Sequence, residues 1–247
     1  MQIVLEGHTA VLHLRGGKAN AMNEAFLRGL GRLFDEVAQS AARAVVITGY
    51  DKFFSAGLAL PVLIDLPRDE MRAFMALFGE TMLRVFACPL PVVAAINGHA
   101  IAGGCVLALQ ADVRLMADGP LRIGLNETQL GIGLPPVVTE PLRLAVPASS
   151  LVPLALQGLL VAPGEALRMG LVDELCAADQ VLPRALARAD ELGRIPPAAF
   201  AQVKAALRQP ARMAIEAARD RDGDAWLDSW YAPAAQALLR AAVAKLA

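Results

Sequence analysis

The sequence of 247 residues contains little cysteine, little histidine and no dense run of basic residues. Its three cysteines, Cys88, Cys105 and Cys176, have neither the pattern of a disulfide framework nor the CxxC spacing of a zinc site. We therefore expect no metal centre and a reducing, cytoplasmic environment. Because 23 Lys and Arg residues are balanced by 24 Asp and Glu residues without a basic patch, we expect no nucleic-acid partner.

An uninterrupted hydrophobic span is also missing. The longest apolar stretch, residues 87–111, is broken by prolines, glycines, Asn97 and His99, which favours a buried strand, turn and helix over a membrane span. The first residues lack the basic segment followed by an apolar segment that marks a cleavable signal. We expect no signal peptide and no association with a membrane.

What the sequence does contain is an alternation of strand-like and helix-like segments. Apolar runs predict strands at residues 3–5, 10–14, 44–48 and 91–96. The first two flank Gly7 as a hairpin would, and Asn20 and Asn23 precede apolar residues at helical spacing as candidate asparagine caps. This alternation predicts an α/β layered fold with largely parallel pairing. After residue 148, Ala, Leu and Arg in helical periods predict a helical C-terminal third.

Adjacent glycines at a predicted strand-to-helix turn are the first candidate for chemistry. Gly103 and Gly104 follow the strand ending near Ile96, and backbone amides without side chains in front of them can approach an anionic oxygen. The alternative is that the two glycines only permit tight packing. Residues 53–60, after the strand at 44–48, form a second turn of small residues that could supply another amide.

Glu127 is the second candidate, because it lies in an apolar neighbourhood between Leu125 and Leu130. Such a setting raises the basicity of a carboxylate toward working pH. Alternatively, the pair Asn126 and Glu127 could simply cap the first turn of a helix.

Two segments with aromatic residues have more than one interpretation. A Met and Phe stripe at helical spacing over residues 71–82 predicts core packing or a partial lining for an apolar ligand. Near the end of the chain, Trp226, Trp230 and Tyr231 predict an apolar helical face that covers either the body of the same chain or a neighbouring subunit.

Taken together, residues 54–60, 95–98, 102–105 and 123–131 resemble the crotonase superfamily, also called the enoyl-CoA hydratase/isomerase family, and are most similar to its Δ3,Δ2-enoyl-CoA isomerases. The resemblance implies a spiral of ββα units at residues 1–190, a helical region at residues 191–247, and trimers or dimers of trimers. It also implies two oxyanion-hole amides at Leu58 and Gly103. Of the two glutamates of the hydratases, one corresponds to Glu127 and the other to Val106.

The valine at position 106, where hydratases have a second glutamate, indicates which reaction the resemblance implies. Adding water to a 2-enoyl thioester is work that two carboxylates divide between them, whereas a double-bond shift needs one base that returns the proton two carbons away. By the resemblance, Glu127 would shift the double bond of a 3-enoyl-CoA to give 2-trans-enoyl-CoA through a dienolate. No cofactor is expected, because the coenzyme A thioester is itself the substrate.

The resemblance also implies a set of substrate-binding residues, with Lys18 near the CoA nucleotide and the acyl tail running toward the Phe74 helix. These residues are Ala56, Gly57, Leu60, Gly104, Asn126, Lys18, Phe74 and Phe78. Ala59 and the segment 133–136 depart from the isomerase pattern. Hydration, decarboxylation, dehalogenation, thioester hydrolysis and acyl-CoA binding without turnover stay open as alternatives, because one fold hosts several reactions.

Overall fold

The strands form two β-sheets, and from the third strand to the eighth they belong alternately to one sheet and to the other. The structure is a computed structural model that describes residues 1–218 and 222–245, the side chains of residues 222 and 223 excepted. The larger sheet has the order β1-β2-β3-β5-β7-β10, and the smaller has the order β4-β6-β8-β9. The strands are β1 (Gln2–Glu6), β2 (Thr9–His13), β3 (Ala44–Thr48), β4 (Phe53–Ser55), β5 (Val92–Ile96), β6 (His99–Ile101), β7 (Val113–Ala117), β8 (Ile123–Gly124), β9 (Leu160–Val161) and β10 (Glu174–Cys176).

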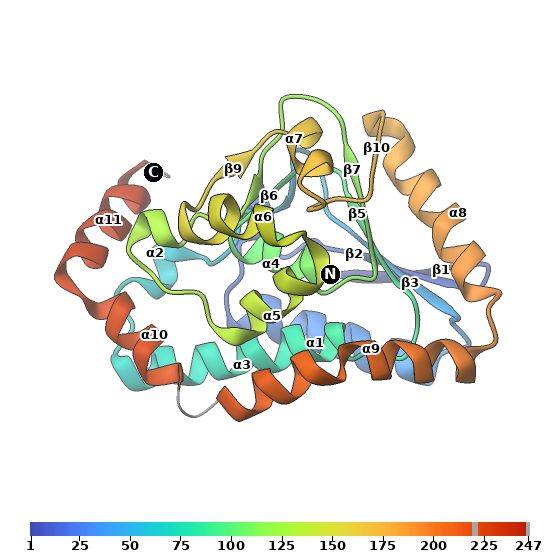
Figure 1. Ribbon diagram of the computed structural model, residues 1–247, viewed down its shortest axis with the longest axis horizontal. Coiled ribbons are helices and arrows are strands. Elements are labelled where there is room, and N and C mark those ends of the chain that lie inside the picture. Colours follow the sequence, from blue (N-terminus) through green and yellow to red (C-terminus); the bar gives the residue numbers. More distant parts are fainter. Residues whose placement is uncertain (219–221, 246–247) are drawn as a thin grey trace.

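Helices complete each pair of strands and cover the sheets (Figure 1). The α-helices are α1 (Glu24–Gln39), α2 (Leu60–Leu63), α3 (Arg68–Phe86), α4 (Gly103–Leu109), α5 (Pro136–Ala145), α6 (Ala148–Leu151), α7 (Pro163–Arg168), α8 (Val181–Gly193), α9 (Pro197–Ala218), α10 (Asp222–Tyr231) and α11 (Pro233–Ala244). Short turns of other helix types are η1 (Lys18–Asn20), η2 (Thr128–Leu130), η3 (Val152–Leu156) and η4 (Ala178–Gln180).

The predicted ββα spiral is confirmed by the order of these elements. In three successive units, β3-β4, β5-β6 and β7-β8, the first strand joins the larger sheet and the second joins the smaller one. The neighbours in each series are parallel. Helices α3, α4 and α5 follow the three units in turn. The loops after the second strands therefore gather at one end of the smaller sheet, where they can form a common site.

Local sequence explains most of these elements. The strands β3 and β5 are buried at every position, as their continuous apolar runs predict. β1 and β2 form the predicted antiparallel hairpin. Asn23 caps α1 as predicted, because its side-chain oxygen accepts a hydrogen bond from the N–H of Phe26 at 2.9 Å. Where the sequence has a strong local pattern, the structure has the element that the pattern predicts.

The C-terminal third is helical as predicted, with two short strands that the local pattern does not indicate. β9 pairs antiparallel with β8, and β10 pairs parallel with β7. Each is only two or three residues long. Because strand pairing depends on a partner far away in sequence, such short edge strands leave little trace in the local pattern.

The C-terminal helices return to the body of the same chain. α9 packs against α5, α8 flanks the larger sheet, α10 packs against α3, and α11 contacts α2 and α10 (Figure 1). Trp226, Leu227, Trp230 and Leu239 belong to the main hydrophobic core. The tail therefore covers its own chain, which settles one of the two readings of its sequence. Residue 190, where the resemblance places the end of the spiral core, lies within α8.

Within residues 1–218 and 222–245, no helix is both long and apolar enough to cross a membrane.

Candidate active site

Two glycine turns touch each other at the end of the smaller sheet. Gly57, in the loop after β4, has φ +85°, a backbone conformation that other residues rarely adopt. A side-chain carbon on Gly57 would lie 2.9 Å from the backbone nitrogen of Gly103 and 2.8 Å from the carbonyl oxygen of Ile101. Only glycine therefore allows the loop after β4 to meet the start of α4.

This contact brings two backbone N–H groups together. The C=O of Gly57 and the N–H of Ala59 both bind the backbone of Met22, at 2.7 and 3.0 Å, so the N–H of Leu58 between them points away from Met22. Gly103 is the first residue of α4, and the N–H groups of a first helical turn have no acceptor within the helix. Leu58 and Gly103 both line one cavity, and neither of these N–H groups is directed at Met22 or at an acceptor within α4.

A cavity of about 100 Å³ opens in front of these amides. Most of its walls are apolar, and among the residues that line it only one, Glu127, is acidic. It brings together a large part of the site predicted from sequence: Ala56, Leu58, Leu60, Phe78, Gly103, Asn126 and Glu127.

The other predicted residues lie outside the walls of this cavity. Gly104 faces β4, since a side-chain carbon there would lie 2.2 Å from the carbonyl oxygen of Ser55. Its absence of a side chain therefore serves packing, the alternative that the sequence left open. Gly57 touches Gly103 from behind, Phe74 is 6% exposed and belongs to the core, and Lys18 is exposed on η1.

Glu127 approaches the cavity from the turn that leads into η2. Its carbonyl oxygen accepts hydrogen bonds from the N–H groups of Leu130 and Ile132, at 2.9 and 3.0 Å, but its side chain makes no capping hydrogen bond. The capping alternative is therefore not what the structure shows. The oxygen Oε2 is buried and has no hydrogen-bond partner within the described residues. Burial disfavours the ionised form and raises the pKa of Glu127 from 4.5 to about 7.

The position that corresponds to a second carboxylate carries no charge. Val106, on α4, is 1% exposed and forms part of the cavity wall. The neighbouring Cys105 is fully buried, and burial raises the pKa of its thiol far above the ordinary value, so the reactive thiolate is disfavoured. The nearby His99 uses its Nδ1 to accept the N–H of Arg122 at 3.0 Å. Glu127 is left as the group in this cavity that can take up a proton near neutral pH.

The sequence did not identify two aromatic residues of the site. Trp226 and Trp230, both on α10, complete the cavity wall and stack with ring centroids 5.3 Å apart. Their sequence pattern indicates an apolar helical face, but gives no sign of which cavity that face covers. Among the described residues, no cluster of three or more His, Cys, Asp or Glu side chains could hold a metal ion.

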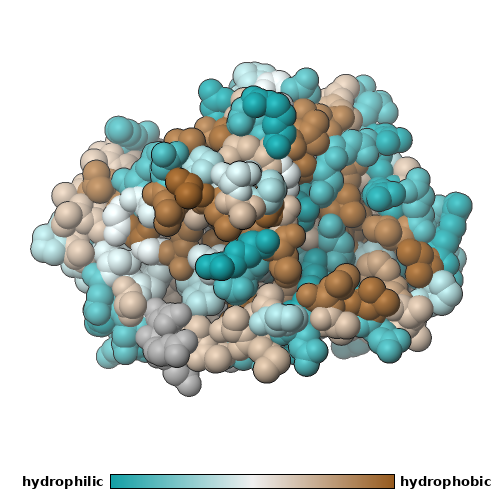
Figure 2. Space-filling view, in the orientation of Figure 1, coloured by the Kyte–Doolittle hydropathy of each residue, from teal (hydrophilic) through white to brown (hydrophobic). Residues whose placement is uncertain are grey.

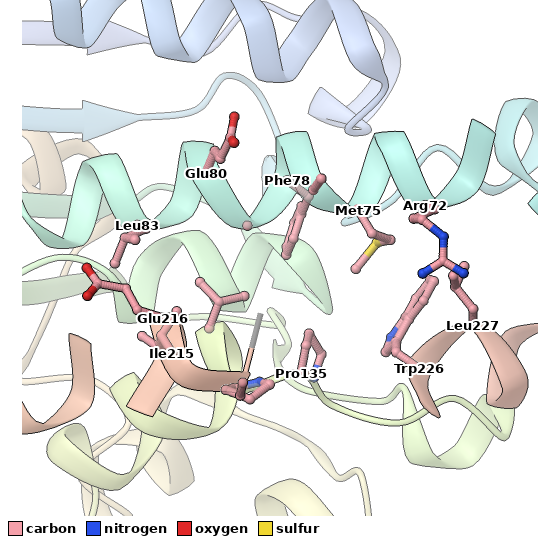
Figure 3. Close-up of a pocket in the computed structure, with 15 residues that line it drawn as sticks. Arg72, Met75, Phe78, Glu80, Leu83, Pro135, Ile215, Glu216, Trp226 and Leu227 are labelled. Atoms are coloured by element: carbon pink, nitrogen blue, oxygen red, sulfur yellow. The ribbon is translucent and has the colours of Figure 1, made fainter. Parts of the chain in front are cut away.

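An apolar groove of about 340 Å³ continues from the cavity between α3, α9 and α10. The two spaces share the wall residues Met75, Phe78, Pro135 and Trp226. In Figure 3, Met75 and Phe78 extend from α3 toward Pro135 and Trp226, while Ile215 lies beside Glu216 at one end of the groove and Leu227 lies beside Trp226 at the other. Charged side chains of Arg72, Glu80 and Glu216 also belong to its lining.

The fold thus places two glycine turns and one buried carboxylate, Glu127, around a largely apolar cavity with an apolar groove beside it. The chain belongs to the enoyl-CoA hydratase/isomerase family, whose sequence profile matches residues 6–230. It is therefore an acyl-CoA enzyme of the crotonase fold.

The relatives of this chain include proteins named as isomerases and proteins named as hydratases. The chain is 32% identical to human mitochondrial enoyl-CoA delta isomerase 1 over 216 residues, which are 86% of this chain and 72% of the relative. It is 33% identical to 2,3-dehydroadipyl-CoA hydratase of Escherichia coli, over 82% of this chain and 79% of the relative. The crystal structure of human mitochondrial delta3-delta2-enoyl-CoA isomerase superimposes with a TM-score of 0.93 at 30% identity, covering all of this chain and 98% of that one.

Proposed function

We propose that the protein is a Δ3,Δ2-enoyl-CoA isomerase, which converts 3-enoyl-CoA into 2-trans-enoyl-CoA. The observation that carries the proposal is the combination of one buried carboxylate, Glu127, with a valine where hydratases have their second glutamate. The likeness to human enzymes named as isomerases supports it.

The chemistry follows from the arrangement. The amides of Leu58 and Gly103 donate to the thioester oxygen and stabilise the negative charge that develops there when a C2 proton leaves. Ionised Glu127 takes that proton, which gives a dienolate, and the same carboxyl group then returns the proton at C4. The double bond moves from C3 to C2, no atom is gained or lost, and Glu127 ends the cycle ionised.

Hydration is the second candidate, because the E. coli relative is named as a hydratase. It needs a group that activates water and a group that protonates the neighbouring carbon. The apolar Val106 cannot take either part.

We expect the wild type to turn over 3-cis- and 3-trans-hexenoyl-CoA, to hydrate crotonyl-CoA only slowly, and to leave a malonyl-type thioester intact. Turnover of crotonyl-CoA in preference to the 3-enoyl substrates would reject the isomerase proposal, and no turnover at all would favour a binding protein.

The acyl tail is proposed to enter the groove beside the cavity. The cavity alone holds about 100 Å³, and the adjoining groove adds about 340 Å³ of largely apolar space beyond Phe78 and Trp226 (Figure 3). An apolar chain gains free energy there by leaving water. Lys18 would contact the CoA moiety, since the carbonyl of its neighbour Ala19 accepts the N–H of Ala56 at 3.0 Å and so places η1 beside the cavity wall.

Filling the groove is expected to shorten the accepted chain. Ala76 lines the groove from α3, and an Ala76→Phe substitution would occupy part of it. We expect the KM for a dodecenoyl-CoA to rise by roughly tenfold, about 1.4 kcal/mol, while hexenoyl-CoA turnover is retained. Ala73→Phe, at an exposed position of the same helix that does not line the groove, is the matched control. Equal effects of both substitutions, or none on the long chain, would place the tail elsewhere.

A trimer or dimer of trimers is also proposed. Large apolar side chains on α5 and α9 are exposed on one surface: Leu144 at 55%, Val203 at 57% and Leu207 at 69%. Exposed apolar patches of this kind are typical of interaction sites (Figure 2). Analytical ultracentrifugation is expected to show three or six copies, and to show smaller species for Leu207→Glu. A monomeric wild type would contradict the proposal.

A further inference from the structure

The turn that carries Glu127 is held at both ends by hydrogen bonds to residues outside it. At its beginning, Thr128 donates its hydroxyl to the carbonyl of Ala155 at 2.8 Å, and Gln129 donates its amide to the carbonyl of Gln157 at 3.0 Å. At its other end, the N–H of Gly133 donates to the hydroxyl oxygen of Ser229 on α10 at 3.1 Å. The end of the turn therefore depends on the C-terminal helices.

Ser229 is bonded in two directions. Its hydroxyl accepts the N–H of Gly133 and donates to the carbonyl of Trp226 at 2.7 Å. Trp226 is itself a wall residue of the cavity. One hydroxyl thus fixes the spacing between the turn of Glu127 and the helix that closes the cavity on the opposite side.

The α11 helix supports the same turn by direct packing. Gly131 has φ +76°, and a side-chain carbon there would lie 3.1 Å from the side chain of Ala235. Ala235 is 1% exposed. The turn therefore packs directly against α11 at Gly131, and the hydrogen bond to Ser229 attaches it to α10 at Gly133.

Glu127 depends on this support because one of its two carboxyl oxygens is not fixed by a hydrogen bond. Its Oε2 has no hydrogen-bond partner within the described residues, so its place is set by the backbone and by packing. The carbonyl of Glu127 is bonded to the N–H of Ile132, which immediately precedes Gly133. A displacement of Gly133 is therefore transmitted through one residue and one hydrogen bond to Glu127.

We propose that Ser229 is a positioning residue, which holds the carboxyl group of Glu127 in register with the amides of Leu58 and Gly103 by anchoring Gly133 to α10. The inference rests on the proposed role of Glu127. It gives the C-terminal helices a part in catalysis that requires no contact between Ser229 and the substrate.

The test compares two serines with the same pair of bonds. Ser40, at the end of α1, donates to the carbonyl of Val37 at 2.8 Å and accepts the N–H of Ala42 at 3.1 Å, and it is half-buried as Ser229 is. Both are replaced by alanine. Because small displacements of a catalytic group are costly, we expect Ser229→Ala to lower kcat roughly tenfold with KM almost unchanged. Ser40→Ala is expected to lower the melting temperature to a similar degree and to leave kcat unchanged.

A second pair keeps the test valid where the alanine variant folds poorly. Threonine and valine have nearly the same shape, but only threonine has a hydroxyl. Ser229→Thr is expected to keep most of kcat and Ser229→Val to lose it. Equal kcat in Thr and Val variants, or equal losses in Ser229→Ala and Ser40→Ala, would overturn the proposal.

A readout without turnover separates this proposal from the proposed function. The ionisation of Glu127 can be followed by infrared or carbon-13 titration, with Glu127→Gln as the reference that identifies its signal. We expect the pKa to fall toward the ordinary range in Ser229→Ala, because a displaced turn admits water to the carboxyl group. An unchanged pKa would count against Ser229 even if the wild type isomerised no substrate, whereas absent isomerisation alone would count only against the proposed reaction.

Discussion

Replacing Glu127 by glutamine is expected to lower kcat for 3-hexenoyl-CoA isomerisation by about 10²- to 10⁴-fold, the usual contribution of a general base. Glutamine has almost the same shape, but it cannot accept the C2 proton. Among the described residues, no other acidic side chain lines the cavity and could replace it. Steady-state kinetics of purified wild type and variant provide the measurement. Near-normal turnover by the variant would reject the assigned role.

Binding and stability distinguish a lost base from a damaged fold. The dissociation constant for a saturated acyl-CoA should stay within a few-fold of the wild type, because the oxyanion amides and the groove are untouched. Glu127 has a folded pKa raised from 4.5 to about 7, so the wild type loses stability as pH rises through this window, by up to about 3 kcal/mol. Glutamine has no proton to lose. The variant should therefore be the more stable protein at pH 8, and less distinctly so at pH 4.

The same pKa sets the pH dependence of the wild type. The base must be ionised to take a proton, so kcat/KM should fall at acidic pH with an inflection near 7, the raised pKa of Glu127 in the free enzyme. An ordinary glutamate would place this inflection near 4.5. A kcat/KM that stays flat down to pH 5 would show that the carboxyl group is solvated in the free enzyme.

Replacing Gly57 by alanine is expected to lower kcat by about 10²- to 10³-fold, the effect of losing an oxyanion-hole donor. The added carbon would lie 2.9 Å from the nitrogen of Gly103 and 2.8 Å from the carbonyl oxygen of Ile101, and φ at this position is +85°. Both effects separate the turn of Leu58 from the start of α4. The two amides can then no longer reach the same oxygen.

The control for this variant is another glycine with free space around it. A side-chain carbon on Gly164, in α7, would meet no atom within 4 Å, so Gly164→Ala should leave kcat unchanged. Circular dichroism and the melting temperature show whether Gly57→Ala is folded. A folded Gly57→Ala enzyme with normal kcat would show that the two amides do not act together. Glu127→Gln remains informative in that case, because it leaves both amides in place.

Much of the fold could be predicted from the chain because its local patterns are strong. Continuous apolar runs predicted the buried β3 and β5, and a polar cap predicted the start of α1 at Asn23. The short β9 and β10 were missed, because two or three residues at a sheet edge are defined by their partner strands. The helical C-terminal third was predicted, but not the cavity that it closes.

The candidate site was likewise predicted in part from the sequence and decided in part by the tertiary structure. The sequence by itself determined which groups were available: one acid at Glu127, a valine at Val106, and glycines where two turns would otherwise collide. Only the tertiary structure decided where they lie. It set Gly103 against Gly57, turned Gly104 and Phe74 into packing residues, and brought Trp226 from α10 to the cavity.

The physical reason is the range of the forces involved. Side-chain periodicity, capping and turn preferences act over a few residues, so a sequence states them directly. The meeting of β4, α4, η2 and α10 depends on strand pairing and packing between segments tens to more than a hundred residues apart. The pKa of Glu127 follows from that packing, because it is burial by distant segments that disfavours its charge.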